Sequence, residues 1–151
     1  MNYRDLRILL IEAPYYEDIA AAQLDGAMTT LDAVAKERQV QITTEKIKVP
    51  GALEIPAAIK FSLEGRWDGY VVLGCVIRGE TSHYDIVCNE CARGVQNLAI
   101  EHGLAVGFGV LTVEDEEQAW VRAKRSEMNK GGEAAKACLE MIDLRDELRT
   151  L

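Results

Sequence analysis

The sequence has little positive charge and no long apolar run. Its 151 residues include 17 lysines and arginines against 25 aspartates and glutamates, which gives a formal net charge of −8. This acidic balance argues against a nucleic-acid-binding surface, although a local basic pocket for an anionic substrate is compatible with it. No apolar run approaches the roughly 20 residues that a membrane-spanning helix needs. We therefore expect neither a nucleic-acid-binding protein nor a membrane protein.

Cysteine is also scarce, with four residues that fall within expected strands and helices rather than in a loop-rich framework. This usage predicts the reduced thiols of a cytoplasmic protein. Cys88 and Cys91 have the CxxC spacing of redox and zinc sites. They lie inside an expected helix without a second CxxC pair, which disfavours both readings. Because the first strand begins within about five residues, we expect no signal peptide.

Apolar runs alternate with segments of helical periodicity along the chain. The expected strands are residues 7–12, 40–49, 70–77 and 104–111, and the expected helices are residues 17–38, 56–64, 82–101, a helix from Thr112 that ends before Met128, and residues 133–148. This alternation predicts one domain, residues 1–151, with a four-stranded parallel sheet in a three-layer αβα sandwich. The last helix is expected to bury Ala134, Ala137, Cys138, Met141 and Ile142, with residues 130–132 as a flexible junction before it.

Ligands of such sheets bind beyond the carboxyl ends of the strands, at a topological switch point. Four segments lie at or near this edge: Tyr15 after Pro14, residues 50–54, residues 78–83 and Phe108. Four motifs at one edge are hard to explain by packing alone. The aromatic residues Tyr15, Tyr16 and Phe108 could belong to the core, but their position at strand ends suits a stacking wall for a planar ring.

The densest of these motifs is GCVIRGETSHYD, residues 74–85, which runs from a buried strand through a glycine turn into a helix. The backbone N–H groups, hydroxyls and positive helix end suit a phosphate, although many helices begin this way. Glu80 would repel a phosphate unless its side chain points away. Arg122 could supply a counter-charge or be a solvated helix arginine. His83 is either a general acid/base or a solvent-exposed histidine.

Read together, several segments resemble the lumazine synthase family. They are VPGALEIP (49–56), GCVIRGETSHYDIVCNE (74–90), GFGVLT (107–112), EQA (117–119) and NKG (129–131). Each is weak alone, but this order and spacing are specific. The resemblance implies a flavodoxin-like fold and the condensation of 5-amino-6-(D-ribitylamino)uracil with 3,4-dihydroxy-2-butanone 4-phosphate to 6,7-dimethyl-8-ribityllumazine, without metal or redox cofactor. The alternative is a flavin- or lumazine-binding protein with little activity, which the intact His83, Arg122 and Lys130 disfavour.

The resemblance also implies roles by position. His83 matches a proton-transferring histidine. The positions that match uracil-binding residues are Tyr15, Ala52, Leu53, Glu54, Cys75, Val76, Ile77, Phe108 and Lys130, and those that match the butanone phosphate site are Glu80, Thr81 and Arg122. Family sites lie between adjacent subunits, so two chains are expected to contribute these residues. Because residues 123–128 lack the glycine-bearing turn typical of capsid-forming members, the resemblance implies a homopentamer or a decamer rather than a sixty-subunit shell.

Overall fold

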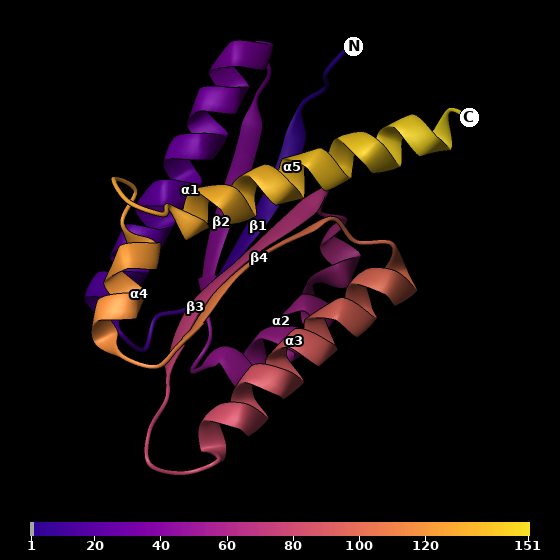
Figure 1. Ribbon diagram of the computed structural model, residues 1–151. Coiled ribbons are helices and arrows are strands. Elements are labelled where there is room, and N and C mark those ends of the chain that lie inside the picture. The colour runs from indigo at the N-terminus through magenta and orange to yellow at the C-terminus, as the bar shows by residue number, and fades with distance from the viewer. Residues whose placement is uncertain (1) are drawn as a thin grey trace.

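The computed structural model describes residues 2–151, so Met1 of the predicted domain lies outside the described residues. In chain order the elements are β1 (Leu6–Ala13), α1 (Glu17–Arg38), β2 (Ile42–Lys48), η1 (Ala52–Glu54), α2 (Ile55–Ser62), η2 (Leu63–Gly65), β3 (Gly69–Ile77), α3 (His83–His102), β4 (Val106–Val113), α4 (Glu116–Ala123) and α5 (Lys130–Arg149). The four strands are parallel in the order β2-β1-β3-β4. Helices α1 and α5 cover one face of the sheet, and α2 and α3 cover the other (Figure 1). The predicted three-layer sandwich is confirmed.

The end of β4 differs from the prediction that Thr112 begins a helix. Thr112 instead pairs with Val76 of β3, so the strand continues to Val113. Asp115 caps α4, because its carboxylate accepts a hydrogen bond of 2.8 Å from the backbone N–H of Gln118. Strand β3 thus provides pairing partners for Thr112 and Val113. Local sequence signals do not reveal this pairing.

Helix α5 begins three residues earlier than predicted, at Lys130 rather than at Glu133. Asn129 takes the left-handed conformation, with φ 49°, and its side-chain oxygen accepts a hydrogen bond of 3.3 Å from the N–H of Gly132. This cap orders the first turn of the helix. Residues 130–132 are therefore helical, and the prediction of a flexible junction was wrong.

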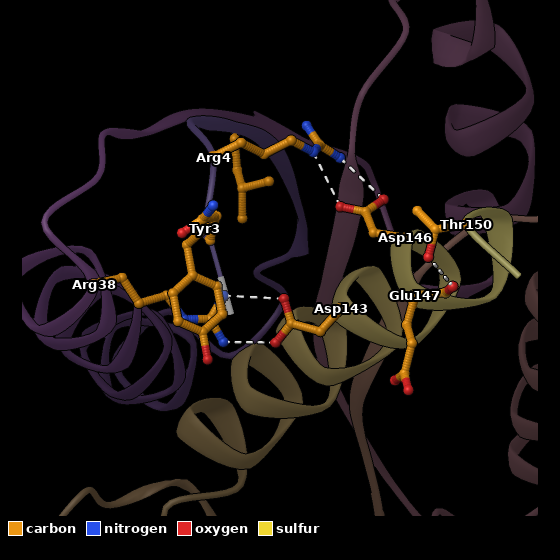
Figure 2. A pocket seen from close by; sticks show the side chains of 9 residues that line it. Tyr3, Arg4, Arg38, Asp143, Asp146, Glu147 and Thr150 are labelled. Carbon is orange, nitrogen blue, oxygen red and sulfur yellow. Dashed lines mark hydrogen bonds and ion pairs between the residues drawn. The ribbon is translucent and has the colours of Figure 1, made fainter.

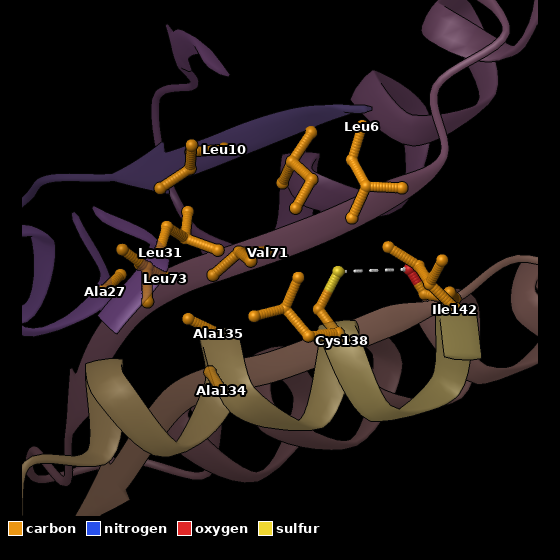
Figure 3. Close-up of a cluster of buried hydrophobic side chains, with 13 residues drawn as sticks. Leu6, Leu10, Ala27, Leu31, Val71, Leu73, Ala134, Ala135, Cys138 and Ile142 are labelled. Atoms are coloured by element: carbon orange, nitrogen blue, oxygen red, sulfur yellow. Dashed lines mark hydrogen bonds between the residues drawn. The ribbon is translucent and has the colours of Figure 1, made fainter. Parts of the chain in front are cut away.

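The face that α5 turns to the sheet also differs from the prediction. Ala137 and Met141 are exposed, whereas Ala135 and Leu139 are buried. Together with Cys138, the two buried residues join side chains of β1, α1 and β3 in one apolar core (Figure 3). The helix is rotated because its small residues at the N-terminal end lie directly against the sheet and α1.

The chain reverses its direction of winding between β1 and β3. These strands are neighbours, with Ala13 of β1 paired with Gly74 of β3. From β1 the chain continues into α1 on one face, and from β3 it continues into α3 on the other (Figure 1). The two connections diverge from the carboxyl edge of the sheet, which is the arrangement that opens a ligand crevice in doubly wound folds.

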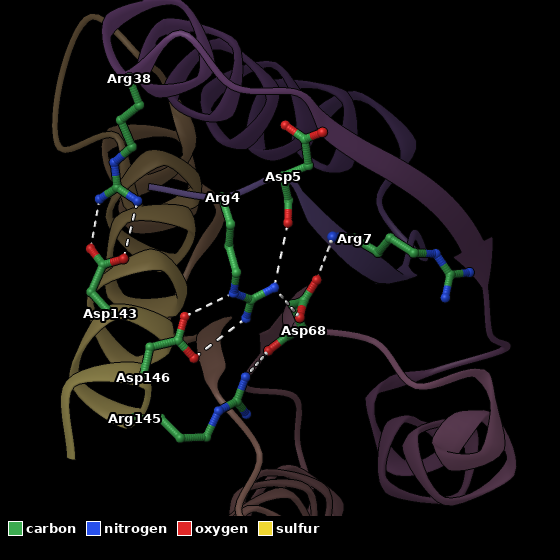
Figure 4. A network of polar contacts seen from close by, with 8 residues as sticks. All are labelled: Arg4, Asp5, Arg7, Arg38, Asp68, Asp143, Arg145 and Asp146. Atoms are coloured by element: carbon green, nitrogen blue, oxygen red, sulfur yellow. Dashed lines mark hydrogen bonds and ion pairs between the residues drawn. The ribbon is translucent and has the colours of Figure 1, made fainter. Parts of the chain in front are cut away.

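Charged side chains tie together the opposite end of the sheet (Figure 4). Arg4 forms ion pairs with Asp68 at 2.9 Å and with Asp146 of α5 at 3.0 Å. Arg145 donates a hydrogen bond of 2.6 Å to the backbone carbonyl of Asp68. Exposed ion pairs contribute little individually, but this network joins three segments that are distant in sequence. Within residues 2–151, no helix combines the length and apolarity needed to cross a membrane.

Candidate active site

A hollow at the carboxyl edge lies in the crevice between β1 and β3 and has a volume of about 420 Å³. It is lined by Tyr15, Tyr16, Gly51, Ala52, Leu53, Glu54, Cys75, Val76, Ile77, His83 and Val87. Four chain segments thus meet here: the ends of β1 and β3, the loop and short helix after β2, and the first turn of α3. Most of the residues predicted to bind the uracil, together with the predicted histidine, line this one hollow.

An aromatic pair stands at the β1 side of the hollow. The ring of Tyr15 is 75% exposed, and its centroid lies 4.9 Å from that of Tyr16 at an interplanar angle of 80°. Tyr16 packs against a buried cluster, and burial raises the pKa of its phenol. The inner tyrosine therefore fixes the outer one, whose ring remains free to stack on a planar ligand. The sequence placed both tyrosines at this edge, but the family resemblance assigned a uracil-binding role only to Tyr15.

The floor of the hollow is the end of β3, where Cys75, Val76 and Ile77 present backbone and apolar side chains. Cys75 is buried, and burial raises the pKa of its thiol to about 11. Because the thiolate is the nucleophilic form of cysteine, this residue is unreactive at neutral pH. Cys75 therefore acts as part of a wall and not as a nucleophile.

His83 is the first residue of α3 and its side chain is exposed at the hollow. The backbone N–H of His83 donates a hydrogen bond of 3.3 Å to the hydroxyl of Thr81, whereas the side chain of Ser82 makes no capping bond. Ser82 therefore occupies the N-cap position, but the side-chain hydrogen bond at the start of the helix comes from Thr81. Val87 lies one helical turn after His83 and also lines the hollow. That i, i+4 spacing was the signal for Val87, which the sequence assignment missed.

The predicted phosphate turn lies between β3 and α3, beside the hollow. Glu80 and Thr81 are exposed there and line none of the hollows described here. Arg78 anchors the turn, since its side chain pairs with Glu114 at 2.8 Å and with Asp85 at 3.4 Å. The turn is therefore held from both sides, by the segment after β4 and by the first turn of α3.

The three remaining predicted residues line a second hollow, of about 440 Å³, along the outer edge of β4. Phe108 is 42% exposed on this edge strand. The Nζ atom of Lys130 lies 2.7 Å from a carboxylate oxygen of Glu133. Arg122 donates a hydrogen bond of 3.1 Å to the carbonyl of Gln118 and forms no ion pair with residues 2–151. No residue lines both hollows. Within one chain, the predicted site residues therefore fall into two separate groups.

A third hollow, of about 270 Å³, lies at the opposite end of the sheet (Figure 2). Two nitrogens of Arg38 bond the carboxylate of Asp143 at 2.6 and 3.1 Å, and the guanidinium lies 3.9 Å from the centroid of the Tyr3 ring. Arg4 and Asp146 are likewise paired with each other. Both arginines of this hollow are therefore engaged in internal pairs, and its position is remote from the carboxyl edge.

The four cysteines are free thiols. Cys88 and Cys91 both lie within α3, and burial raises the pKa of both, that of Cys91 to about 11. Across residues 2–151, no group of three or more His, Cys, Asp or Glu side chains is placed to hold a metal ion. The polar groups at or beside the hollow include the imidazole of His83, the hydroxyl of Thr81 and the guanidinium of Arg78.

A doubly wound parallel sheet with an exposed tyrosine, an apolar floor and a helix-start histidine at its switch point defines an α/β protein with a candidate ligand site at the carboxyl edge of its sheet. Comparison with known proteins identifies the family. Residues 5–146 match the family model described as 6,7-dimethyl-8-ribityllumazine synthase. The chain belongs to the 6,7-dimethyl-8-ribityllumazine synthase family.

Curated relatives agree with this assignment over nearly their whole length. The chain is 51% identical over 151 residues to 6,7-dimethyl-8-ribityllumazine synthase 1 of Rhizobium meliloti (strain 1021), covering 96% of this chain and 95% of the relative. It is 48% identical over 147 residues to the synthase of Agrobacterium fabrum (strain C58), with 93% and 95% covered. It is also 48% identical over 141 residues to that of Sphingopyxis alaskensis, again with 93% and 95% covered. The family's reaction is a transferase step of riboflavin biosynthesis that forms 6,7-dimethyl-8-ribityllumazine from the ribitylaminouracil and the butanone phosphate, and it is the reaction of this chain.

Proposed function

We propose that this chain performs the condensation in the hollow between β1 and β3, completed by Phe108, Arg122 and Lys130 of a neighbouring copy. The observation that carries this proposal is the separation of the predicted residues into two hollows with no shared lining residue. Because β4 is an edge strand, its hollow faces outward, where a second copy can reach it. A site formed between two copies brings the two groups of residues together.

The first hollow suits the ribitylaminouracil. The exposed ring of Tyr15 can stack on the pyrimidine, and the backbone of residues 75–77 offers hydrogen bonds to the ring edge. The short helix Ala52–Glu54 lies across the crevice, where its backbone and the Glu54 carboxylate can hold the ribityl hydroxyls. Lys130 of the neighbour supplies a cation for a ring carbonyl.

The turn after β3 suits the phosphate of the second substrate. Thr81 offers a hydroxyl, and the first amides of α3 point from the positive end of a 20-residue helix. Glu80 is exposed, which allows its carboxylate to turn away into solvent. Arg122 of the neighbour supplies a positive charge, since that of Arg78 in the turn is engaged by Glu114 and Asp85. Fixing the ketone against the amine in this way can lower the barrier by several kcal/mol, up to ~7–11 in ideal cases.

His83 lies between the two substrate positions, in the first hollow and immediately after the turn. Imidazole can accept and donate protons near neutral pH. We assign it the proton transfers of imine formation and phosphate elimination. The 5-amino group attacks the ketone, and one water leaves as the imine forms. Loss of a proton from the adjacent carbon then drives departure of the phosphate with the C–O bond electrons. The ribitylamino nitrogen attacks the carbonyl that results and closes the ring with loss of a second water, while His83 carries protons between these centres.

For the assembly we propose a homopentamer, with a decamer as the larger form. The exposed apolar residues Met141, Leu144 and Leu148 on α5, and Phe61 on α2, support burial between copies. Sedimentation velocity on the purified protein measures the assembly directly, and a sixty-subunit particle would contradict the proposal.

We place the enzyme in the cytoplasm, because its four thiols are free and its substrates are small metabolites.

A turnover assay tests the reaction. Mixing both substrates with the protein should produce the lumazine, followed by its absorbance and fluorescence. Binding of riboflavin or lumazine without turnover would instead indicate a binding protein.

Subunit mixing tests the shared site. His83→Ala and Arg122→Ala chains should each have low activity, and co-expressed mixed assemblies should regain part of it. Some interfaces in these assemblies join an intact His83 half to an intact Arg122 half.

Arg122→Ala alone should raise KM for the butanone phosphate far more than KM for the uracil. Arg125→Ala is the matched control, because Arg125 is exposed and pairs with Asp25 at 3.0 Å. Equal changes in both KM values, or no recovery on mixing, would count against the assignment.

A further inference from the structure

A buried glutamine of α1 connects the two hollows within one chain. Gln23 is 1% exposed, although most of its neighbours in the core are apolar. Its side-chain nitrogen donates two hydrogen bonds of 2.9 Å, one to the carbonyl of Gly74 in β3 and one to the carbonyl of Gly109 in β4. Both N–H groups of the amide are therefore used, and both acceptors belong to the sheet.

The two acceptor carbonyls, of Gly74 and Gly109, lie next to residues of β3 and β4 that line the hollows. Gly74 directly precedes Cys75 in the floor of the first hollow. Gly109 directly follows Phe108 in the wall of the second. Gln23 thus joins β3 and β4 at the level of the site, and helix α1 brings it there from the face opposite α3.

A third segment meets the same residue. Gly131 follows Lys130 in the first turn of α5, and a Cβ atom on Gly131 would overlap the backbone carbonyl of Gln23. The absence of a side chain at Gly131 lets α5 lie directly on α1 at this point. The position of Lys130 is therefore set against the same turn of α1 that holds the two strands.

Stability alone does not account for a polar residue here. An apolar side chain of similar volume avoids the cost of burying an amide. A fully satisfied buried amide, however, fixes its partners in one geometry. The backbone groups that contact Gln23 adjoin Cys75, Phe108 and Lys130, which are three of the residues that we propose bind the uracil. None of these groups adjoins Thr81 or Arg122, which we propose bind the phosphate.

We propose that Gln23 is a positioning residue for the ribitylaminouracil. Gln23 fixes two parts of the chain relative to each other. One is the floor of this chain's own ring pocket, and the other is the pair Phe108 and Lys130, which contributes to the site of the neighbouring copy. This inference rests on the proposed function. It requires that loss of the amide weakens use of the uracil and spares the butanone phosphate.

The test is Gln23→Met, which keeps the length of the side chain and removes both donors. We expect KM for the uracil to rise roughly three- to tenfold, as for the loss of about one hydrogen bond, and KM for the butanone phosphate to stay within about twofold. Gln23→Leu repeats the measurement if the methionine variant does not fold.

Leu31→Val is the matched control. Leu31 is fully buried on the same helix but lies about 12 Å further from the site, at 1.5 Å per residue. It should lower Tm without separating the two KM values. Unchanged KM values in the Gln23 variants, equal changes for both substrates, or the same separation in Leu31→Val would each overturn the inference. Failure of the wild-type protein to form lumazine would reject the proposed function itself, so the two failures are distinguishable.

Discussion

The guanidinium of Arg78 lies over the ring of Tyr84, with 4.2 Å between its central carbon and the ring centroid. The same guanidinium pairs with Glu114 and Asp85, and these acidic neighbours raise its pKa. Its contacts therefore come from α3 and from the segment after β4. Arg78 acts as the anchor of the proposed phosphate turn, with its positive charge already engaged by two carboxylates.

Replacing Arg78 should loosen the turn without removing a phosphate ligand. We expect Arg78→Gln to raise KM for the butanone phosphate by roughly two- to fivefold, because exposed ion pairs each contribute little. KM for the uracil should not change. Arg93→Gln is the control, since it removes an exposed ion pair with Glu90 elsewhere on α3. Steady-state kinetics with each substrate varied in turn measures both, and an unchanged phosphate KM would exclude the anchoring role.

His83→Ala should reduce turnover by an amount toward the lower end of the ~10²–10⁴-fold range of acid–base catalysis, because amines and ketones condense unaided. The rate of lumazine formation at saturating substrate is the measurement. His102→Ala provides the comparison, because His102 is the last residue of the same helix. Wild-type turnover in the His83 variant would remove this residue from the mechanism.

Gly131→Ala should destabilise the protein, because the added Cβ would overlap the carbonyl of Gln23. Overpacking typically costs about 1–3 kcal/mol, which corresponds to a fall in Tm of roughly 3–10 °C for a chain of this size. At Gly79 an added Cβ meets no atom within 4 Å, so Gly79→Ala should leave Tm nearly unchanged. Thermal unfolding followed by circular dichroism compares the two, and equal Tm values would show that α1 and α5 move apart without cost.

Stability should fall at alkaline pH because of buried thiols. Burial raises the pKa of Cys91 from 9.0 to about 11, so the unfolded chain releases this proton at a lower pH than the folded chain does. The contribution of Cys91 is fully present below pH 9 and is lost as pH rises toward 11, and it amounts to at most on the order of 3 kcal/mol. Cys91→Ala should therefore show a shallower loss between these values in urea unfolding. Parallel curves for the two proteins would mean that Cys91 does not contribute.

Much of the fold follows from local patterns. The bounds of α1 were predicted as the structure has them, because its apolar residues recur at helical spacing over many turns. The predictions were wrong where contacts with a segment distant in sequence determine the local structure. Thr112 extends β4 because β3 offers it a partner, and α5 is rotated because its glycines lie against α1. Neither partner is visible within a short window of sequence.

The site divides in the same way. Contiguous motifs identified His83, the turn before it and the end of β3, since these residues are neighbours in sequence as well as in space. The joint placement of Tyr15 and residues 52–54 required the strand order β2-β1-β3-β4, which brings the ends of three strands to one crevice. Gln23 gave no signal at all, because its partners lie 51 and 86 residues away.

By itself, the sequence determined the order of the elements, the sheet class and the family, because periodicity and contiguous motifs are properties of neighbouring residues. Only the tertiary structure decided that Phe108, Arg122 and Lys130 lie in a different hollow from His83, and that one amide joins the two regions. The physical reason is that crossovers place β3 in the interior of the sheet and β4 at its edge. The residues to which we assign one reaction are thereby directed toward two different hollows.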